Sequence, residues 1–295
     1  MIFLKTNILI ILLNLIFLSQ AVATEACEQA NDLLYQAYDL YSKQDSFSQQ
    51  KQLLKRAIKI CPKAPKIHNA LAFVLENKGE HHLAIKHYKL ALQQNPKLYE
   101  AWYDLAELYY EQNQFILSLE AYLNICITDK DAKEQIKLLL DKQRYAVVDS
   151  GKVVSKENLL LLYGNNNFNR KLFACGIDSQ IQPAFLFYNL KFKHNVLHST
   201  SYSQLDEIAA TLRELYTSTI EIHAHTDAFT SSMNRDELNL KLSQKHAETI
   251  ANALVERGIS AERIGAVGHG YRKPIAYGTS PEVVKKNTRI EIVSF

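Results

Sequence analysis

The amino-acid sequence predicts a multidomain chain in which an all-α repeat solenoid precedes an α+β domain, a βαβ-based mixed sheet with helices packed on it. Two patterns predict this. The same residue types recur every 34 residues in the N-terminal half, and from Ala184 onward strand-like and helix-like hydrophobic periods alternate. At 295 residues, 47% of them hydrophobic, the chain is long enough for two cores.

The first 23 residues have the shape of a signal peptide. Lys5 precedes an apolar run from Ile8 to Leu18, and small residues follow at Ala21-Val22-Ala23. A membrane-spanning helix needs about 20 apolar residues, so this run is too short for a permanent anchor. We therefore expect residues 1–23 to be removed and the mature protein to lie in the periplasm, peripheral to the outer membrane at most. Basic and acidic residues nearly balance, 34 against 31, and do not favour a nucleic-acid partner.

Three contiguous units follow, over residues 31–64, 65–98 and 99–132. Equivalent positions carry equivalent residues, as shown by Leu54, Tyr88 and Tyr122 and by Ala57, Ala91 and Ile125. This pattern resembles the tetratricopeptide repeat, in which each unit is a pair of antiparallel amphipathic helices. One such pair cannot bury its own apolar face, so the units stack into a solenoid with a concave groove.

We place the solenoid at residues 24–144, with an extra helix over residues 131–143 covering the last repeat. Its groove is expected to recruit an envelope or exported protein, whose identity the sequence does not give. The alternative is that the repeats only space or dimerise the protein. Aromatic residues crowd the first helix of the repeats, which suits either a peptide groove or internal packing: Tyr35, Tyr38, Tyr41, Trp102, Tyr103, Tyr109 and Tyr110.

Export gives the four cysteines an oxidising compartment in which disulfides persist. Cys27 and Cys61 lie near the start and the end of the first helical pair, side by side in an antiparallel hairpin, so we predict a disulfide between them. Cys126 and Cys175 are candidates for a second bridge, and that pairing stays open. Close Cys or His pairs of the kind that bind zinc are absent from the cysteine spacing, so we predict no metal and no cofactor.

Residues 145–183 show poor periodicity, with breaks at Asp149-Ser150-Gly151 and at residues 164–167. We expect a linker with one short helix. From residue 184 to 295 the patterns predict a strand near Leu186, a helix with Leu205 and Leu212 on one face, further strands, and a long helix that Gly258 ends.

Three segments of this region occur in a specific order: Ala224-His225-Thr226-Asp227, then residues 239–247 with Asn239 and Ser243, then Asn287-Thr288-Arg289. They resemble the motifs of the OmpA-like domain. The resemblance covers residues 184–295 and implies noncovalent binding of peptidoglycan through the diaminopimelate of its stem peptide. That ligand is zwitterionic, so the site needs an anion for an ammonium group and a cation for a carboxylate.

By this resemblance Asp227 is the ammonium ligand, and Thr226 and Asn239 bond the ligand or brace the loop. The carboxylate ligand of the family is an arginine in the long helix, where this sequence has His246. A histidine is mostly neutral at pH 7 and offers one weaker hydrogen bond unless a bound carboxylate raises its pKa. Arg289 matches the second arginine of the family motif and is a further candidate for the carboxylate.

The sequence leaves two alternative functions. In the first, the chain is a periplasmic interaction scaffold whose OmpA-like domain has lost wall binding. In the second, His223, His225, Asp227 and His246 form the metal site of a hydrolase, but no H-E-x-x-H or comparable spacing is present. Gly265, Gly268 and Gly270 do not open a helix as a nucleotide-binding loop does, and we interpret them as a turn at a strand end. The sequence thus predicts a protein that is not an enzyme.

Overall fold

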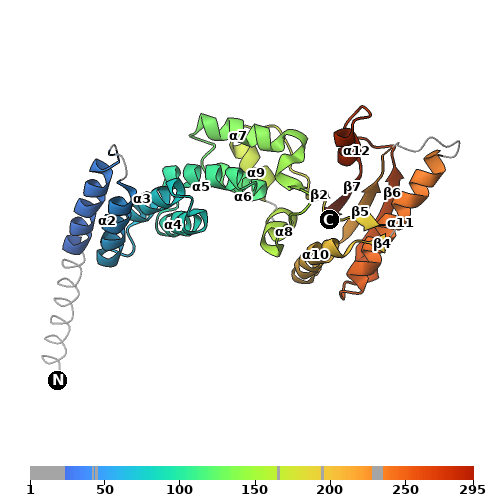
Figure 1. Cartoon of the computed structure of the whole chain (residues 1–295), viewed down its shortest axis with the longest axis horizontal. Helices are drawn as coiled ribbons and strands as arrows, with labels where there is room; N and C mark the ends of the chain where they lie inside the picture. Colours follow the sequence, from blue (N-terminus) through green and yellow to red (C-terminus); the bar gives the residue numbers. More distant parts are fainter. Residues whose placement is uncertain (1–23, 42, 44–45, 165–166, 194–195, 228–234) are drawn as a thin grey trace, which may run out of the picture. The chain divides into compact units, whose positions relative to one another are not determined.

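The computed structural model describes residues 24–41, 43, 46–164, 167–193, 196–227 and 235–295 (Figure 1). The predicted signal peptide, residues 1–23, lies outside this part of the chain. The chain divides into two compact units, an N-terminal unit that ends at Asn113 and a C-terminal unit over Gln114–Phe295. Within the described residues, no helix is both long and apolar enough to cross a membrane.

The N-terminal unit is built of helices that follow the 34-residue repeat. A helix over residues 24–39 precedes α2 (Phe47–Ile60), α3 (Pro65–Asn77), α4 (His81–Gln94) and α5 (Tyr99–Glu111). The residues that recur in the sequence are the ones packed between helices, since Leu54, Tyr88, Ala57 and Ala91 are all buried. The repeat interpretation of this region is therefore confirmed.

Local chemistry explains where these helices begin and end. Pro65 occupies the first turn of α3, where its missing N–H would lack a helical partner in any case. Gly79 follows α3 with a φ of +73°, a conformation that costs glycine little because it has no Cβ. These two residues set the length of the helix and the tight turn into α4.

Both cysteine pairs form disulfides. Cys27 bonds to Cys61 across the first helical pair, with a Cα–Cα distance of 5.0 Å and a sequence separation of 34 residues. This is the pairing that we expected. Cys126 bonds to Cys175, with the Cα atoms 5.6 Å apart, and both residues lie in the C-terminal unit.

The C-terminal unit starts with α6 (Phe115–Tyr122), α7 (Lys130–Leu140) and a 3-10 helix, η1 (Asp141–Ala146). The expectation of one short helix between residues 145 and 183 is wrong. That segment contains β1 (Val147–Val148), α8 (Lys156–Tyr163) and α9 (Asn167–Ala174), and Val147 pairs with Leu186 in the sheet. Each helix has only 8 residues, too few for a periodic pattern to stand out.

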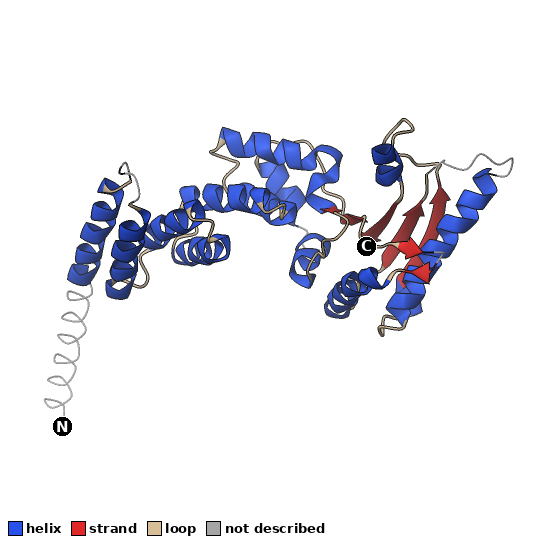
Figure 2. Cartoon of the chain, in the orientation of Figure 1, coloured by secondary structure: helices blue, strands red, loops and turns tan. Residues whose placement is uncertain are grey.

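A five-stranded mixed sheet forms the centre of this unit, in the order β1-β2-β7-β5-β6. Figure 2 shows its strands in red, with helices beside them. The strands β2 (Ala184–Phe187) and β5 (Ile220–His225) both pair antiparallel to β7 (Arg289–Ser294), and β5 pairs parallel to β6 (Ile264–Gly270). Beyond the end of β2, a short hairpin forms a separate two-stranded sheet from β3 (Phe192–Lys193) and β4 (Val196–Leu197). The α+β fold with a mixed sheet is confirmed.

Two long helices, α10 (Tyr202–Glu214) and α11 (Arg235–Val255), belong to this unit, and α11 packs along β5 and β6 (Figure 1). Gly268 lies inside β6 and touches the α11 backbone near Gln244. Gly265 also lies inside β6 and Gly270 is its last residue, so the expectation of a turn at these glycines is wrong for the first two. Glycine is needed where the helix approaches the strand this closely.

Candidate functional site

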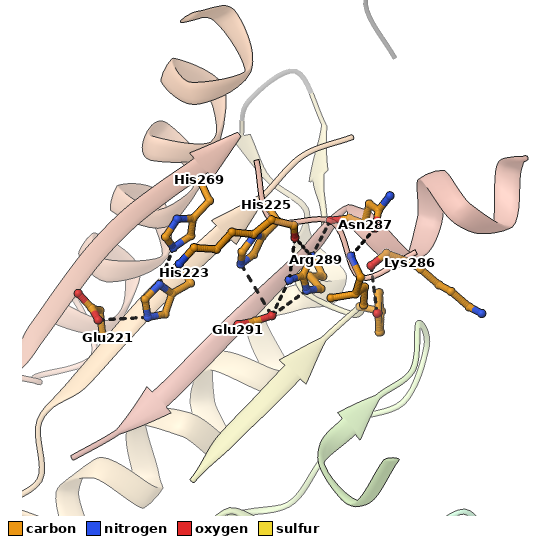
Figure 3. A network of polar contacts seen from close by, with 11 residues as sticks. Glu221, His223, His225, His269, Lys286, Asn287, Arg289 and Glu291 are labelled. Carbon is orange, nitrogen blue, oxygen red and sulfur yellow. Dashed lines mark hydrogen bonds and ion pairs between the residues drawn. The ribbon is translucent and has the colours of Figure 1, made fainter. Parts of the chain in front are cut away.

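The candidate site lies at the carboxyl end of β5. Successive side chains of a strand point to opposite faces, so Ile220, Ile222 and Ala224 face one side and Glu221, His223 and His225 the other. Gly268, the register partner of Ala224, touches α11, which identifies the first side as the helix-covered face. The second face carries a network of polar side chains (Figure 3). Thr226 and Asp227 continue the chain beyond the strand.

The side chain of Asp227 is half-buried and accepts a long hydrogen bond of 3.4 Å at its Oδ1 from Asn287 Nδ2. Among the described residues it forms no ion pair. Asn287 is itself held in place, because its Oδ1 accepts from the backbone N–H groups of Ile275 and Ala276 at 3.0 Å each. A buried amide at the end of α12 (Pro281–Asn287) thus fixes one edge of the aspartate without neutralising its charge.

Arg289 lies opposite His225 in the sheet register and is 4% exposed. Its guanidinium group bonds twice to Glu291 Oε1, from Nε at 2.8 Å and from Nη2 at 2.7 Å (Figure 3). The remaining donors reach the backbone oxygens of Lys273 and Asn287 at 3.3 Å. The structure therefore brings Arg289 close to the strand end that carries Asp227, with its charge already paired to Glu291.

Three histidines pack together on the same face of the sheet. The ring of His269 stacks on those of His223 and His225, with centroids 5.0 and 4.8 Å apart, and His223 Nδ1 lies 2.7 Å from His269 Nε2. Burial, and then the positive charge of Arg289, lower the pKa of His225 to about 2. His225 is thus neutral at physiological pH, and its Nε2 lies 3.8 Å from Glu291 Oε1.

Thr226 and Asn239 meet around Gly270, the last residue of β6. The backbone N–H of Thr226 donates to Gly270 O at 2.9 Å, and a Cβ atom placed on Gly270 would lie 3.5 Å from Asn239 Cβ of α11. Both side chains are buried, and Thr226 Oγ1 has no hydrogen-bond partner among the described residues. The two flanking residues expected at the site are therefore brought together, one on each side of the strand end. The intervening residues 228–234 lie outside the described part.

His246 lies seven residues after Asn239 on α11, about 10 Å further along the helix axis. Its ring stacks on Phe192 of β3, with centroids 3.8 Å apart and an angle of 13° between the planes. Burial, and then the charge of Lys245, lower the pKa of His246 to about 4. Its Nε2 has no hydrogen-bond partner in the described structure. His246 and Asp227 thus have different partners, and His246 is uncharged at neutral pH.

The metal-site alternative finds no support in the geometry. The described residues contain no group of three or more His, Cys, Asp or Glu side chains placed to hold a metal ion. His223 and His225 do share a face of the sheet, but His246 stacks on the β3 hairpin instead of joining them. The ring contacts with His269 account for the two strand histidines.

The sequence analysis did not predict the roles of three residues in this region. Glu291 pairs with Arg289, His269 stacks on the strand histidines, and Asn287 donates to Asp227. Glu291 follows Arg289 by two positions, so a strand assignment for residues 289–294 places both side chains on one face. That signal was available. The contacts of His269 and Asn287 depend on the order of the strands and on the loop before α12, which no local pattern encodes.

The fold and the strand-end site define the class of this protein. Residues 191–288 match the OmpA family, and residues 78–115 match the tetratricopeptide repeat. The chain therefore carries an OmpA-like domain behind a helical repeat region.

Particular relatives resemble the C-terminal part. The probable lipoprotein YiaD of Escherichia coli is 34% identical over 88 residues, which are 30% of this chain and 38% of that protein. The peptidoglycan-binding protein ArfA of Mycobacterium bovis is 34% identical over 92 residues, 31% of this chain and 27% of that protein. The chain thus spans about a third of the length of these curated relatives. Neither name is that of an enzyme.

Among solved structures, the peptidoglycan-associated lipoprotein from Burkholderia pseudomallei is similar to this chain. The two are 28% identical with a TM-score of 0.32, and the match covers 36% of this chain and 86% of the lipoprotein chain.

Proposed function

We propose that this chain is a non-enzymatic cell-envelope protein that binds peptidoglycan noncovalently through its C-terminal domain and recruits a protein partner through its repeats. The proposal of peptidoglycan binding rests on the environment of the Asp227 side chain. It is a half-buried carboxylate at a strand end, held by Asn287 and without an ion pair among the described residues. Such a group is suited to bind the ammonium of diaminopimelate, the ligand that the resemblance to OmpA-like domains implies.

A specific observation favours the second candidate function, an interaction scaffold that has lost wall binding. The zwitterionic ligand also needs a cation for its carboxylate. Arg289 is already paired with Glu291, and His246 is uncharged and packed on Phe192. The two candidate functions therefore differ in one measurable property, whether the protein binds the wall through Asp227.

The test is sedimentation of the full chain with purified peptidoglycan at pH 7.5 and pH 6. Asp227→Ala is expected to weaken binding by about 10- to 100-fold, the worth of a charge-assisted hydrogen bond. Asp178→Ala, which removes an exposed aspartate elsewhere in the same unit, is the matched control and should pellet like the unaltered chain. Equal pelleting of the Asp227→Ala variant and the unaltered chain would remove Asp227 from the site. An unaltered chain that stays in solution at both pH values would favour the scaffold.

His246→Arg is expected to tighten wall binding by about tenfold, because an arginine is charged at any physiological pH and can bind a carboxylate with two parallel hydrogen bonds. Its planar group can also stack on Phe192 as the imidazole does. His82→Arg adds the same charge on an exposed position of α4 and controls for nonspecific attraction to the wall. Tightening by both variants alike, or by neither, would contradict a carboxylate subsite at residue 246.

The unaltered chain should bind the wall equally at pH 7.5 and pH 6. The pKa of His246 is lowered to about 4, so the histidine remains neutral across this range. A clear gain at pH 6 would instead show that a bound carboxylate draws a proton onto His246.

A further inference from the structure

The N-terminal unit contains a cavity of about 290 Å³ between the first helices of its repeats. Its walls come from the 24–39 helix and the residues after it, from α2, from α3 and from α5. The aromatic part consists of Tyr38, Tyr41 and Phe73, with the rings of Tyr41 and Phe73 5.6 Å apart. Tyr38 and Tyr41 are 50% and 62% exposed, so these rings are open to a ligand as well as packed on the helix.

The polar part of the lining includes Asp104 of α5 and Asn69 of α3. Asn69 Oδ1 is buried and accepts no hydrogen bond from any described residue. A buried acceptor without a donor costs free energy, and a ligand that supplies an N–H group removes that cost. The cavity thus combines aromatic surface, a carboxylate and an unused hydrogen-bond acceptor.

The charges that act on Asp104 are negative. The pKa of Asp104 is raised to about 7, first by burial and then by the negative charges of Glu76 and Glu100, with Glu107 adding a smaller effect. The hydroxyl of Tyr88, from α4, opposes this rise and also donates to Glu76 at 2.6 Å. Burial raises the pKa of Tyr38 most, and the charges of Tyr35 and then Glu100 raise it further.

A ligand for this cavity must therefore bring positive charge. A basic side chain satisfies all three parts of the lining: its charged head pairs with a carboxylate, its methylene stem packs on aromatic rings, and its cation is attracted to the ring faces. The peptide group next to such a residue carries the N–H that an asparagine oxygen can accept. An acidic or neutral segment would bring no positive charge to the half-buried carboxylate of Asp104.

We propose that this cavity binds an arginine or lysine side chain from an extended segment of a partner protein, with the cationic head at Asp104. The stem lies against Tyr38, Tyr41 and Phe73, and Asn69 accepts a backbone N–H of the segment. This inference rests on the proposed recruitment of a partner by the repeats and gives that partner a chemistry.

The test uses the full chain and four pools of fluorescein-labelled nonapeptides, measured by fluorescence anisotropy. Each pool has arginine, lysine, citrulline or glutamate at its centre and uncharged residues at random elsewhere. Citrulline keeps the shape of arginine without its charge. The arginine and lysine pools are expected to bind about tenfold more tightly than the citrulline pool, the worth of one charged hydrogen bond.

Asp104→Asn should reduce that difference to less than about threefold, because the amide keeps the shape of the carboxylate and loses its charge. Asp32 is an exposed aspartate on the 24–39 helix that does not line the cavity. Asp32→Asn should therefore leave the difference in affinity between the arginine and citrulline pools unchanged. Raising the pH from 6 to 8 should strengthen binding of the arginine pool by about tenfold, since the cation competes with the proton on Asp104. Binding of the citrulline pool should not change with pH.

The proposal is overturned if no pool binds, if the citrulline and arginine pools bind equally, or if Asp104→Asn leaves the arginine preference intact. A pull-down from envelope extract separates this failure from failure of the proposed function. If the unaltered chain and Asp104→Asn retain a partner equally, the repeats do recruit a protein, but a basic side chain at Asp104 is not the means. Wall sedimentation of Asp104→Asn should equal that of the unaltered chain.

Discussion

Glu291→Gln is expected to lower the free energy of unfolding of the C-terminal unit by about 3 kcal/mol, the low end of the cost of breaking a buried ion pair. Arg289 is 4% exposed and would keep its positive charge without the carboxylate that neutralises it. Two backbone oxygens would still accept from the guanidinium group at 3.3 Å. They accept from the two terminal nitrogens only, and they leave the charge of the guanidinium group uncompensated.

The measurement is urea unfolding followed by two probes. Far-ultraviolet circular dichroism reports both units, whereas Trp102, the single tryptophan, reports the N-terminal unit. Glu291→Gln should shift the dichroism transition and leave the tryptophan transition in place. Glu221→Gln makes the same chemical change in β5, on the same face of the sheet. The Glu221 side chain is 38% exposed and lies near His223, so this variant should shift neither unfolding transition.

Replacing both members of the pair tests the explanation. The Arg289→Met/Glu291→Leu double variant should recover most of the lost stability, because apolar residues of similar size require no neutralising partner. A double variant as unstable as Glu291→Gln would show that the pair acts by something other than compensation of charge.

Gly268→Ala is expected to destabilise the C-terminal unit by about 3 kcal/mol, the upper part of the range for overpacking a filled core. A Cβ atom at this position would collide with the backbone nitrogen and Cα of Gln244 and with Ser243 Oγ. Backbone atoms of a helix cannot rotate away as a side chain can. The helix α11 would have to move off β6.

Such a movement would also break the hydrogen bonds that join α11 to β6. Gly268 N–H donates to Gln244 Oε1 at 2.7 Å, and Gly270 N–H donates to Ser243 Oγ at 2.8 Å. If α11 moves off β6, we expect the amides of Gly268 and Gly270 to exchange hydrogen faster. Mass spectrometry or nuclear magnetic resonance can measure this exchange. The same displacement would shift Asn239 relative to Gly270 and so weaken wall binding.

Gly265→Ala is the matched control in the same strand. Its Cβ atom would meet Glu221 Cγ at 3.2 Å, and that side chain can turn away. Loss of backbone freedom in the unfolded chain offsets the small contact, so the change in stability should be within about 0.5 kcal/mol of zero. Equal destabilisation by both substitutions would refute the close approach of α11 as the cause.

The repeat region shows what the chain encodes locally. A period of 34 residues is visible in the sequence because each unit must bury the same positions, and Ala57 and Ala91 are buried as that requirement predicts. The segment after residue 145 shows the opposite case. Its helices have 8 residues each, about two turns, so an apolar face repeats too few times to identify them.

The sequence by itself determined the order of the two folds, the positions of the long helices and strands, the Cys27–Cys61 disulfide and the strand end at which Asp227 lies. Only the tertiary structure decided the charge state of the residues around it. Arg289 pairs with Glu291, His246 packs on Phe192, and His225 is held neutral. The physical reason is that periodicity is a property of neighbouring residues, whereas burial and ion pairing depend on which distant strand and helix lie alongside.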